Sequence, residues 1–322
     1  MSSGGGDPSA GFAAVPDTCT RSPTTTAREY PTIGSYAPVP EMFRRSTRGL
    51  VSPRVEALRQ IDGWPVEFAA AGVIDPTGAV WTRGDAGRAV RLASVSKPVT
   101  ALAVLIAAEE GVVDLDEPAG PPGATVRHLL SHTSGLPFEG TEPIARPEHR
   151  RIYSNEAFRV LAAHLEQHAE MAFADYAREA VCSPLAIDLD PSGDPGSGMH
   201  ASLDDVLAVG RELLTPHLIA DETRDEMVSI QFPGLPGVLP DHGRFDPLDW
   251  GLGVQLNTVP PSWMGTRTSA RTYGHFGGTG TFLWVDPVAR VVCAALMTRE
   301  FDEWAKEAWP RLADAVLDEL GV

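Results

Sequence analysis

The chain has 322 residues, and its 43 acidic against 26 basic residues give a formal net charge of −17. A protein this acidic, with no basic block, is not expected to bind nucleic acid or an anionic membrane surface. The three cysteines are widely spaced and form no CxxC pair, so no disulfide framework is expected.

The first predicted segment is an N-terminal tail. Residues 1–50 are rich in Gly, Ser, Thr and Pro and are expected to be disordered or loosely packed. The start of this tail lacks the basic residues and apolar core of a signal peptide, and no apolar run approaches the roughly 18 residues that span a bilayer. A cytoplasmic protein is therefore expected.

The structured pattern begins directly after the tail. Residues 54–61 predict a short helix with Ser52 as its N-cap. Residues 66–85 predict a β-hairpin, because two apolar runs flank an Asp-Pro-Thr-Gly turn. Residues 97–110 then predict a buried helix, in which Pro98 is tolerated because it lies in the first turn.

Helical patterns dominate the middle of the chain, and strand patterns return near its end. The predicted helices cover residues 125–132, 156–169, 175–181 and 203–214. The predicted strands cover residues 250–256, 280–287 and 290–298. An amphipathic helix over residues 302–320 closes the chain, and Pro310 is expected to break it. Strands at both ends with helices between them predict an α+β fold in which one sheet is completed by the two ends.

Lys97 is one of only two lysines in the chain, whereas the other 24 basic residues are arginines. Arginine cannot lose its proton in a protein, but a buried lysine can be shifted toward neutrality and act as a base. Ser94 precedes Lys97 by three residues, which places both side chains on one face of a helix. This S-x-x-K pattern indicates an activated serine nucleophile, although a surface lysine near an N-cap serine would give the same letters.

Two further segments carry side chains suited to the same chemistry. In Tyr153-Ser154-Asn155, the tyrosine can relay a proton near an amine, and the asparagine can bind both a lysine and a substrate carbonyl. Residues 273–281 (YGHFGGTGT) place several glycines beside a predicted strand, where a substrate backbone can approach closely. Taken alone, each segment is better explained as an ordinary helix cap or glycine-rich turn.

Together and in this order, the three motifs resemble the serine β-lactamase and penicillin-binding-protein superfamily. The closest match is its class C-like branch, which also contains esterases, D-amino-acid peptidases and acyltransferases. The similarity includes the stretches LASVSKPVTALAVLIAAEEGVVDLDEP, VRHLLSHTSGLP, YSNEAF, WGLGVQL and YGHFGGTGTFLWVDPVARVVCAALMTR. It implies a β-lactamase/DD-peptidase-like fold, with an antiparallel sheet flanked by helices and an inserted helical lobe. Residues 51–92 and 245–322 would form the α/β lobe and residues 93–244 the mainly helical lobe, with the active site between them.

The resemblance also implies roles for individual residues. Ser94 is then the nucleophile, and Lys97 is its base or proton relay. Tyr153 is the second member of the proton shuttle, and Asn155 orients the lysine and the substrate. The backbone N–H groups of Ser94 and Gly278 would form an oxyanion hole.

His275 is a departure from the pattern, because typical lactamases and peptidases have a lysine in its place. That lysine helps to hold the carboxylate of a penicillin-like substrate, and a largely neutral histidine would hold it less firmly. The substitution therefore favours neutral esters or amides. His275, Gly277 and Gly278 are expected to contact the substrate, and residues 138–150 and 231–248 are expected to shape its pocket.

The expected function is hydrolysis of an ester or amide bond in a small molecule through an acyl-enzyme on Ser94. The alternatives are an acyltransferase of the same fold, a β-lactamase or D-amino-acid peptidase, and a non-catalytic binding or sensor module. The chain lacks a GxSxG elbow, a P-loop, a dinucleotide fingerprint and HExxH spacing, so no cofactor and no metal site are expected. His132, in LLSHTSGLP, is expected to belong to a structural turn. The sequence predicts no oligomeric state.

Overall fold

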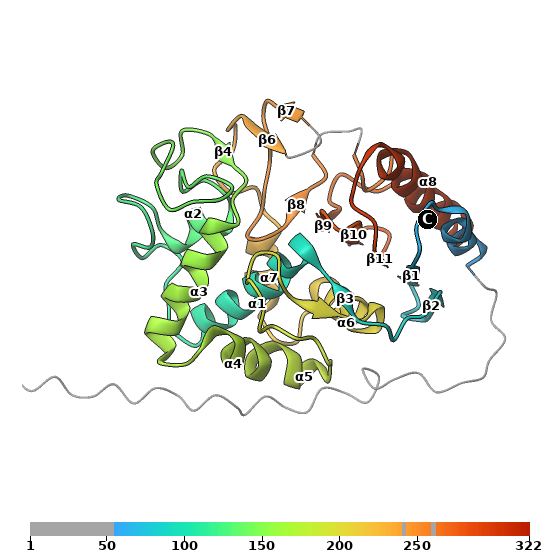
Figure 1. Ribbon diagram of the computed structural model, residues 1–322, viewed down its shortest axis with the longest axis horizontal. Helices are drawn as coiled ribbons and strands as arrows, with labels where there is room; N and C mark the ends of the chain where they lie inside the picture. Colours follow the sequence, from blue (N-terminus) through green and yellow to red (C-terminus); the bar gives the residue numbers. More distant parts are fainter. Residues whose placement is uncertain (1–54, 240–242, 259–261) are drawn as a thin grey trace, which may run out of the picture. The chain divides into compact units, whose positions relative to one another are not determined.

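The computed structural model describes residues 55–239, 243–258 and 262–322. The tail predicted over residues 1–50 and the predicted N-cap Ser52 lie outside this part of the chain. The described residues combine helices with an antiparallel sheet, so the predicted α+β class is confirmed (Figure 1). None of the helices in these ranges is long and apolar enough to cross a membrane.

The main sheet is built from segments near both ends of the chain. Its six strands lie in the order β2-β1-β11-β10-β9-β8, and every neighbouring pair is antiparallel. The strands are β1 (Ala69–Ile74), β2 (Val80–Arg83), β8 (Gln255–Leu256), β9 (Tyr273–Gly277), β10 (Thr281–Asp286) and β11 (Val291–Met297). Strand β1 pairs with β11, and Ala71 lies opposite Ala295. The hairpin predicted over residues 66–85 and the C-terminal strands therefore complete one sheet, as predicted.

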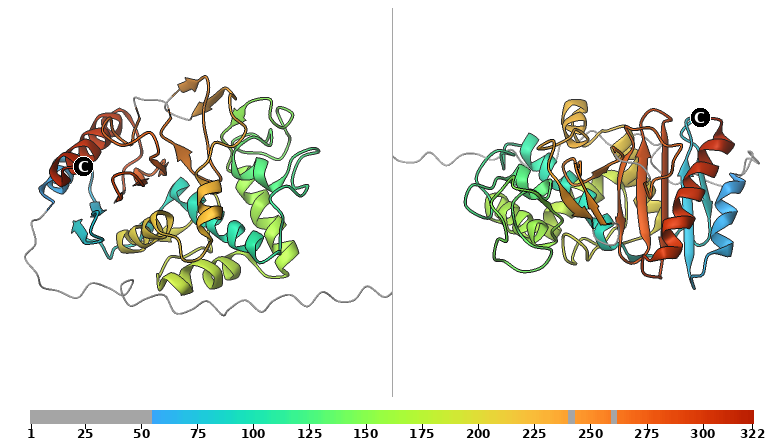
Figure 2. Two further views of the ribbon diagram at one scale, coloured as in Figure 1. Left: turned by 180° about the vertical axis from the view of Figure 1, so that it is seen from behind. Right: turned by 90° about the horizontal axis from the view of Figure 1, so that it is seen from above.

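Apolar side chains cover both faces of this sheet. Along β11, Val292 and Ala294 belong to one buried cluster, whereas Cys293 and Ala295 belong to a second. This alternation arises because successive side chains of a strand point to opposite faces. The first cluster includes α1 (Ser96–Glu109) and α6 (Leu203–Leu214), and the second includes α8 (Glu303–Leu320). The sheet thus lies between the other α-helices on one side and, on the other, α8 with the 3-10 helix Glu56–Gly63 (Figure 2).

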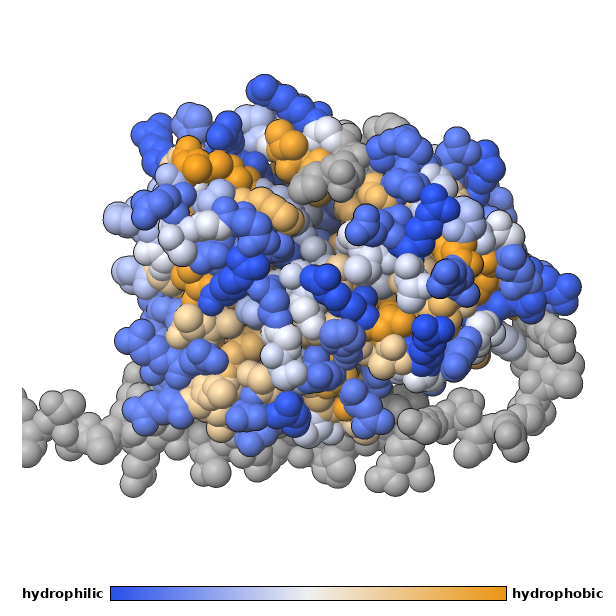
Figure 3. Space-filling model, viewed as in Figure 1, coloured by the Kyte–Doolittle hydropathy of each residue, from blue (hydrophilic) through white to orange (hydrophobic). Residues whose placement is uncertain are grey.

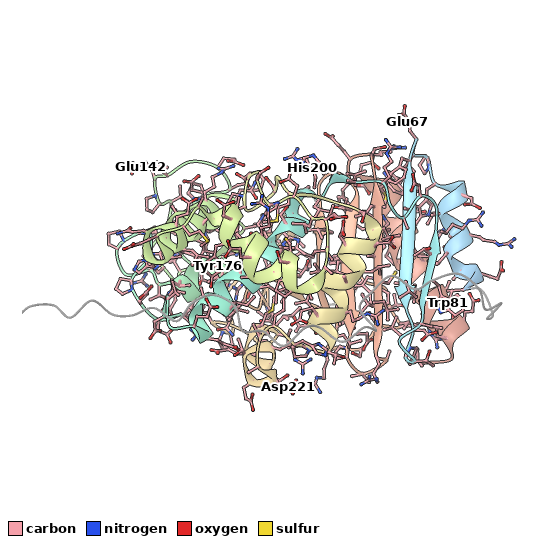
Figure 4. The ribbon with its side chains drawn as sticks, turned by 90° about the horizontal axis from the view of Figure 1, so that it is seen from below. Glu67, Trp81, Glu142, Tyr176, His200 and Asp221 are labelled. Atoms are coloured by element: carbon pink, nitrogen blue, oxygen red, sulfur yellow. The ribbon has the colours of Figure 1, made fainter. Side chains whose placement is uncertain are left out.

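The remaining elements are short or lie on the helical side of the sheet. The other helices are α2 (Val126–Leu130), α3 (Glu156–Ala169), α4 (Phe173–Ala177), α5 (Ser183–Leu185) and α7 (Asp221–Met227). Two small sheets pair β3 (Val90–Arg91) with β5 (His200–Ala201), and β4 (Arg151–Ile152) with β6 (Gly237–Leu239) and β7 (Gly243–Phe245). Figure 4 shows Tyr176 among the helices and Trp81 on β2, an edge strand of the main sheet.

Three details differ from the sequence prediction. Residues 250–256 contain only the two-residue strand β8, and residues 273–277 form the full strand β9 instead of a glycine-rich turn. Pro310 lies inside α8 without ending it. The helix continues because Trp309 and Leu312, on either side of the proline, are buried in the second apolar cluster. Packing thus outweighs the one backbone hydrogen bond that the proline removes.

Candidate active site

Ser94 lies in a single 3-10 turn, Ala93–Val95, that connects β3 to α1. Ala93 has a φ of 48°, in the left-handed region that non-glycine residues seldom adopt. Neighbouring elements hold this conformation: Ser96 Oγ donates to the Ala93 carbonyl oxygen at 2.7 Å, and Thr281 Oγ1 donates to that of Leu92 at 2.6 Å. Ser94 itself is partly exposed, so a substrate can reach its hydroxyl.

Lys97 is completely buried in the first turn of α1. Its Nζ lies 3.3 Å from Ser94 Oγ and donates to Asn155 Oδ1 at 2.7 Å and to the Gly196 carbonyl oxygen at 2.8 Å. Burial lowers the pKa of Lys97 from 10.5 to about 7, although the carboxylates of Asp194 and Glu139 oppose this effect. The amine is therefore available in its neutral form near neutral pH.

Asn155 is the N-cap of α3, and Tyr153 lies two residues before it. Lys97 Nζ lies 4.7 Å from the centroid of the Tyr153 ring, and the tyrosine side chain is hydrogen-bonded to that of Ser94. Burial raises the pKa of Tyr153 well above its usual value, and the hydrogen bond with Ser94 only partly offsets this rise. The predicted residues of the first two motifs are thus brought together, with Tyr153 as a neutral phenol.

An ionic network supports Asn155 from the side away from Lys97. Asn155 Nδ2 donates to Glu139 Oε1 at 2.9 Å. Arg159, one turn along α3, donates to the carboxylates of Glu139 at 2.5 Å, Glu156 at 3.0 Å and Asp194 at 2.6 Å. These contacts fix the amide so that its oxygen faces Lys97.

The glycine-rich segment places His275 and Gly277 on β9 and Gly278 just beyond it. A Cβ on Gly277 would lie 2.4 Å from the Leu92 carbonyl oxygen and 2.9 Å from Ala93 Cβ. Only glycine therefore allows β9 to approach the turn that carries Ser94. Around Gly278 the corresponding space is open, so its backbone can face a substrate.

His275 is buried, and its ring centroid lies 5.9 Å from that of Tyr153. Burial and the nearby Lys97 lower the pKa of His275 to about 3, so the imidazole is neutral. Its Nδ1–H donates to the Phe276 carbonyl oxygen at 2.7 Å, which leaves Nε2 as a hydrogen-bond acceptor. No described side chain pairs with this buried Nε2.

His132 and Trp250 complete the surroundings of Tyr153. Their ring centroids lie 4.5 Å and 5.8 Å from that of the tyrosine. The Ser154 N–H donates to His132 Nδ1 at 3.2 Å, so the turn predicted at His132 also supports the Tyr153 segment. Trp263, by contrast, packs against Trp309 beneath α8.

Sequence reasoning missed the individual roles of three groups at this site. The Gly196 carbonyl and the Asp194 carboxylate come from the glycine-rich loop GDPGSG, and Glu139 comes from a proline-rich segment. The glycine and proline content signalled loops at both places. It could not indicate that one loop carbonyl would accept a hydrogen bond from Lys97.

This chain is similar to known proteins in sequence and in fold. A family model described as Beta-lactamase matches residues 48–317. A solved β-lactamase structure from Mycobacterium bovis is 46% identical, covers 83% of this chain and 100% of its own, and superposes with a TM-score of 0.81. The structure of EstCE1, described as a hydrolase with promiscuous acyltransferase activity, shares the fold with a TM-score of 0.68 at 20% identity, covering 82% of this chain and 97% of that one.

Penicillin-binding protein 4* of Bacillus subtilis (strain 168) is 29% identical over 130 residues, which cover 30% of this chain and 29% of that protein. The match thus spans less than a third of that relative. The match to the family model extends over most of the present chain, and the structural likeness confirms the predicted β-lactamase-like fold. The chain therefore belongs to the Beta-lactamase family.

Proposed function

We propose that this chain is a serine hydrolase that cleaves a carboxylic ester or amide bond in a small molecule through an acyl-enzyme on Ser94. The observation that carries the proposal is the hydrogen bonding of the buried Lys97 amine. A neutral amine has two N–H groups and one lone pair. Asn155 Oδ1 and the Gly196 carbonyl oxygen accept the two N–H groups at 2.7 and 2.8 Å. The lone pair is thereby left for the proton of the Ser94 hydroxyl at 3.3 Å.

In the acylation step, Lys97 Nζ takes the Ser94 proton while Oγ bonds to the substrate carbonyl carbon and the carbonyl electrons move onto oxygen. The N–H groups of Ser94 and Gly278 would stabilise this oxyanion, and each donor contributes about 3 kcal/mol in comparable sites. Tyr153 keeps its proton near neutral pH, so it can pass that proton to the leaving group and take up in its place the proton that Lys97 received from Ser94. Water then hydrolyses the acyl-enzyme and frees Ser94.

Ester hydrolysis is expected to rise with pH through about 7, because only neutral Lys97 can accept the Ser94 proton. Below that pH, kcat/KM should fall about tenfold per pH unit, since a single proton inactivates the base. His275 stays neutral in this range because its pKa is about 3, so it adds no second titration to the pH profile of kcat/KM. A profile of kcat/KM for p-nitrophenyl butyrate against pH measures this, and a flat profile would contradict the role of Lys97.

The side chains around the site favour a neutral, partly apolar substrate. The ring of Phe138, which is 48% exposed, stacks on that of Tyr153 at a centroid distance of 6.0 Å. Hydrophobic surface is visible near β4 and β6, in the region of the two segments predicted to shape the pocket (Figure 3). Arg159 is bound by three carboxylates, and His275 is neutral, so neither offers a free cation to a substrate carboxylate.

The proposed function is tested by following p-nitrophenyl butyrate and a chromogenic cephalosporin in parallel with the full chain. We expect ester turnover, together with a butyryl adduct that mass spectrometry maps to Ser94 in quenched samples. Transfer of the butyryl group to an added alcohol, in place of water, would indicate the acyltransferase alternative. The absence of both turnover and adduct would favour a binding module instead.

β-Lactam hydrolysis is the second candidate, because the 46% identical structure from Mycobacterium bovis is described as a β-lactamase. In the parallel assay, cephalosporin turnover exceeding ester turnover would establish it. That outcome would also show that neutral His275 suffices to hold a substrate carboxylate.

Replacing His275 with lysine is expected to shift the preference from the ester toward the cephalosporin. A cation at this position could donate a charge-assisted hydrogen bond to the lactam carboxylate. The added hydrogen bond should raise the ratio of kcat/KM for the cephalosporin to kcat/KM for the ester by about tenfold or more. His275→Gln is the matched control, because it keeps a neutral hydrogen-bonding side chain. An equal shift in both variants would mean that charge is not the cause.

A further inference from the structure

A second group of chemically active side chains lies at the far end of α3 from Asn155. His164 and His168 are four residues apart on this helix, so their side chains share one face. Glu117 reaches the same place from the loop between α1 and α2. One ligand atom from each of the three residues can be chosen so that all lie within 4.8 Å of one another.

The contacts show that the three side chains are already oriented toward a common point. Glu117 Oε1 lies 2.6 Å from His164 Nε2 and 3.9 Å from His168 Nε2. The His168 Nδ1–H donates to the His164 carbonyl oxygen at 2.8 Å, which leaves the lone pair of His168 on Nε2, facing Glu117. Such a hydrogen bond from the second ring nitrogen is the usual way in which a ligating histidine is held in place.

The backbone around Glu117 is also fixed. Its N–H donates to the Asp114 carbonyl oxygen at 3.1 Å, and its own carbonyl oxygen accepts from the Val126 N–H at 3.3 Å. The side chains of His164, His168 and Glu117 are 14%, 34% and 27% exposed, so an ion from solvent can enter. The group is therefore both partly buried and accessible.

We propose that Glu117, His164 and His168 form a binding site for a divalent transition-metal ion, with Zn²⁺ as the favoured occupant. Two imidazoles and one carboxylate suit zinc, and water would take the fourth position. In a tetrahedral site with bonds of about 2 Å, neighbouring ligand atoms lie about 3.3 Å apart. The distances from Glu117 Oε1 to His164 Nε2 and His168 Nε2, 2.6 and 3.9 Å, would each change by less than about 1 Å. Binding through Nε2 would require His164 to carry its proton on Nδ1, which exchange with solvent allows.

The site departs from the sequence-based expectation of no metal. It would join the loop after α1 to α3, and these two helices carry Lys97 and Asn155 at their starts. A bound ion would therefore clamp together the elements that present the catalytic side chains. About 13 Å of helix separates Asn155 from His164, so the ion itself would not contact the reacting atoms.

The test is isothermal titration of Zn²⁺ into the full chain, produced without a polyhistidine tag and first stripped with EDTA. We expect one ion to bind with micromolar or tighter affinity. His164→Ala and His168→Ala should each weaken binding about tenfold or more. His200→Ala is the matched control, because His200 is an exposed histidine on β5, outside the cluster, and should leave binding unchanged (Figure 4).

A third variant and a thermal-unfolding measurement test the same zinc site. Glu117→Gln preserves the shape of the third ligand but removes its charge, so it should also weaken Zn²⁺ binding. This variant tests the site even if His164→Ala fails to fold. Zn²⁺ should raise the thermal midpoint of the wild type and of His200→Ala but not that of His168→Ala. Equal Zn²⁺ binding by wild type, His164→Ala and His168→Ala, or no binding below millimolar concentration, would overturn the proposal whether or not the chain hydrolyses esters.

Discussion

Replacing Ser94 with alanine is expected to lower kcat/KM for p-nitrophenyl butyrate by about 10⁴-fold or more, because the acyl group would have no oxygen to which it could bond. Lys97, Asn155 and the oxyanion donors remain in this variant, but none of them can replace the missing nucleophile. The butyryl adduct should disappear together with turnover. Because the side chain of Ser94 is partly exposed and small, the substitution should leave the thermal midpoint nearly unchanged.

Ser96→Ala is the matched control, since the same motif contains both serines. Ser96 Oγ is fully buried, donates to the Ala93 carbonyl oxygen and accepts from the Met199 N–H at 3.2 Å. Its loss should reduce stability by about 1–3 kcal/mol while turnover falls roughly tenfold or less. A Ser94→Ala variant with substantial turnover, or a butyryl adduct on a different residue, would remove Ser94 from the mechanism.

Local spacing and family resemblance were sufficient to predict that Ser94, Lys97 and Asn155 lie together. Ser94 and Lys97 are three residues apart on one turn, so their proximity follows from helix geometry alone. Asn155 lies 58 residues beyond Lys97, and its 2.7 Å contact could be anticipated only from the resemblance. The α+β class also followed from the sequence, because the strand patterns occur near the ends and the helical patterns between them.

The rest of the site depends on tertiary packing that no local pattern encodes. Gly196 accepts a hydrogen bond from Lys97 because of a loop conformation, and no property of a glycine predicts where its carbonyl points. Strand β9 was not foreseen because glycines lower strand propensity, yet Gly277 is needed for the close approach to Ala93. The i, i+4 pair His164 and His168 could have been noticed on the predicted helix, but its partner from another segment could not.

Replacing Lys97 with arginine is expected to lower kcat/KM by about 10²–10⁴-fold, close to the effect of Lys97→Met. Arginine keeps the positive charge but cannot release a proton, so the comparison separates basicity from charge. Lys306→Arg is the matched control: Lys306 is the only other lysine, it pairs with Glu303 at 2.6 Å at the surface, and its exchange should leave turnover unchanged. Wild-type-like activity in Lys97→Arg would contradict the assignment of the base.

A purely structural role for Lys97 would also reduce activity, so a second measurement is needed. Burial lowers the pKa of Lys97 from 10.5 to about 7, so between these pH values the unfolded chain binds more protons than the folded chain at this residue. The contribution of Lys97 to the free energy of unfolding should therefore increase as pH rises through this window. Lys97→Met cannot titrate and should lack this increase, as denaturant unfolding at several pH values would show. If Lys97→Met loses the pH-dependent increase in stability together with turnover, while remaining as stable as wild type near pH 7, the lost activity reflects the missing base and not a damaged fold.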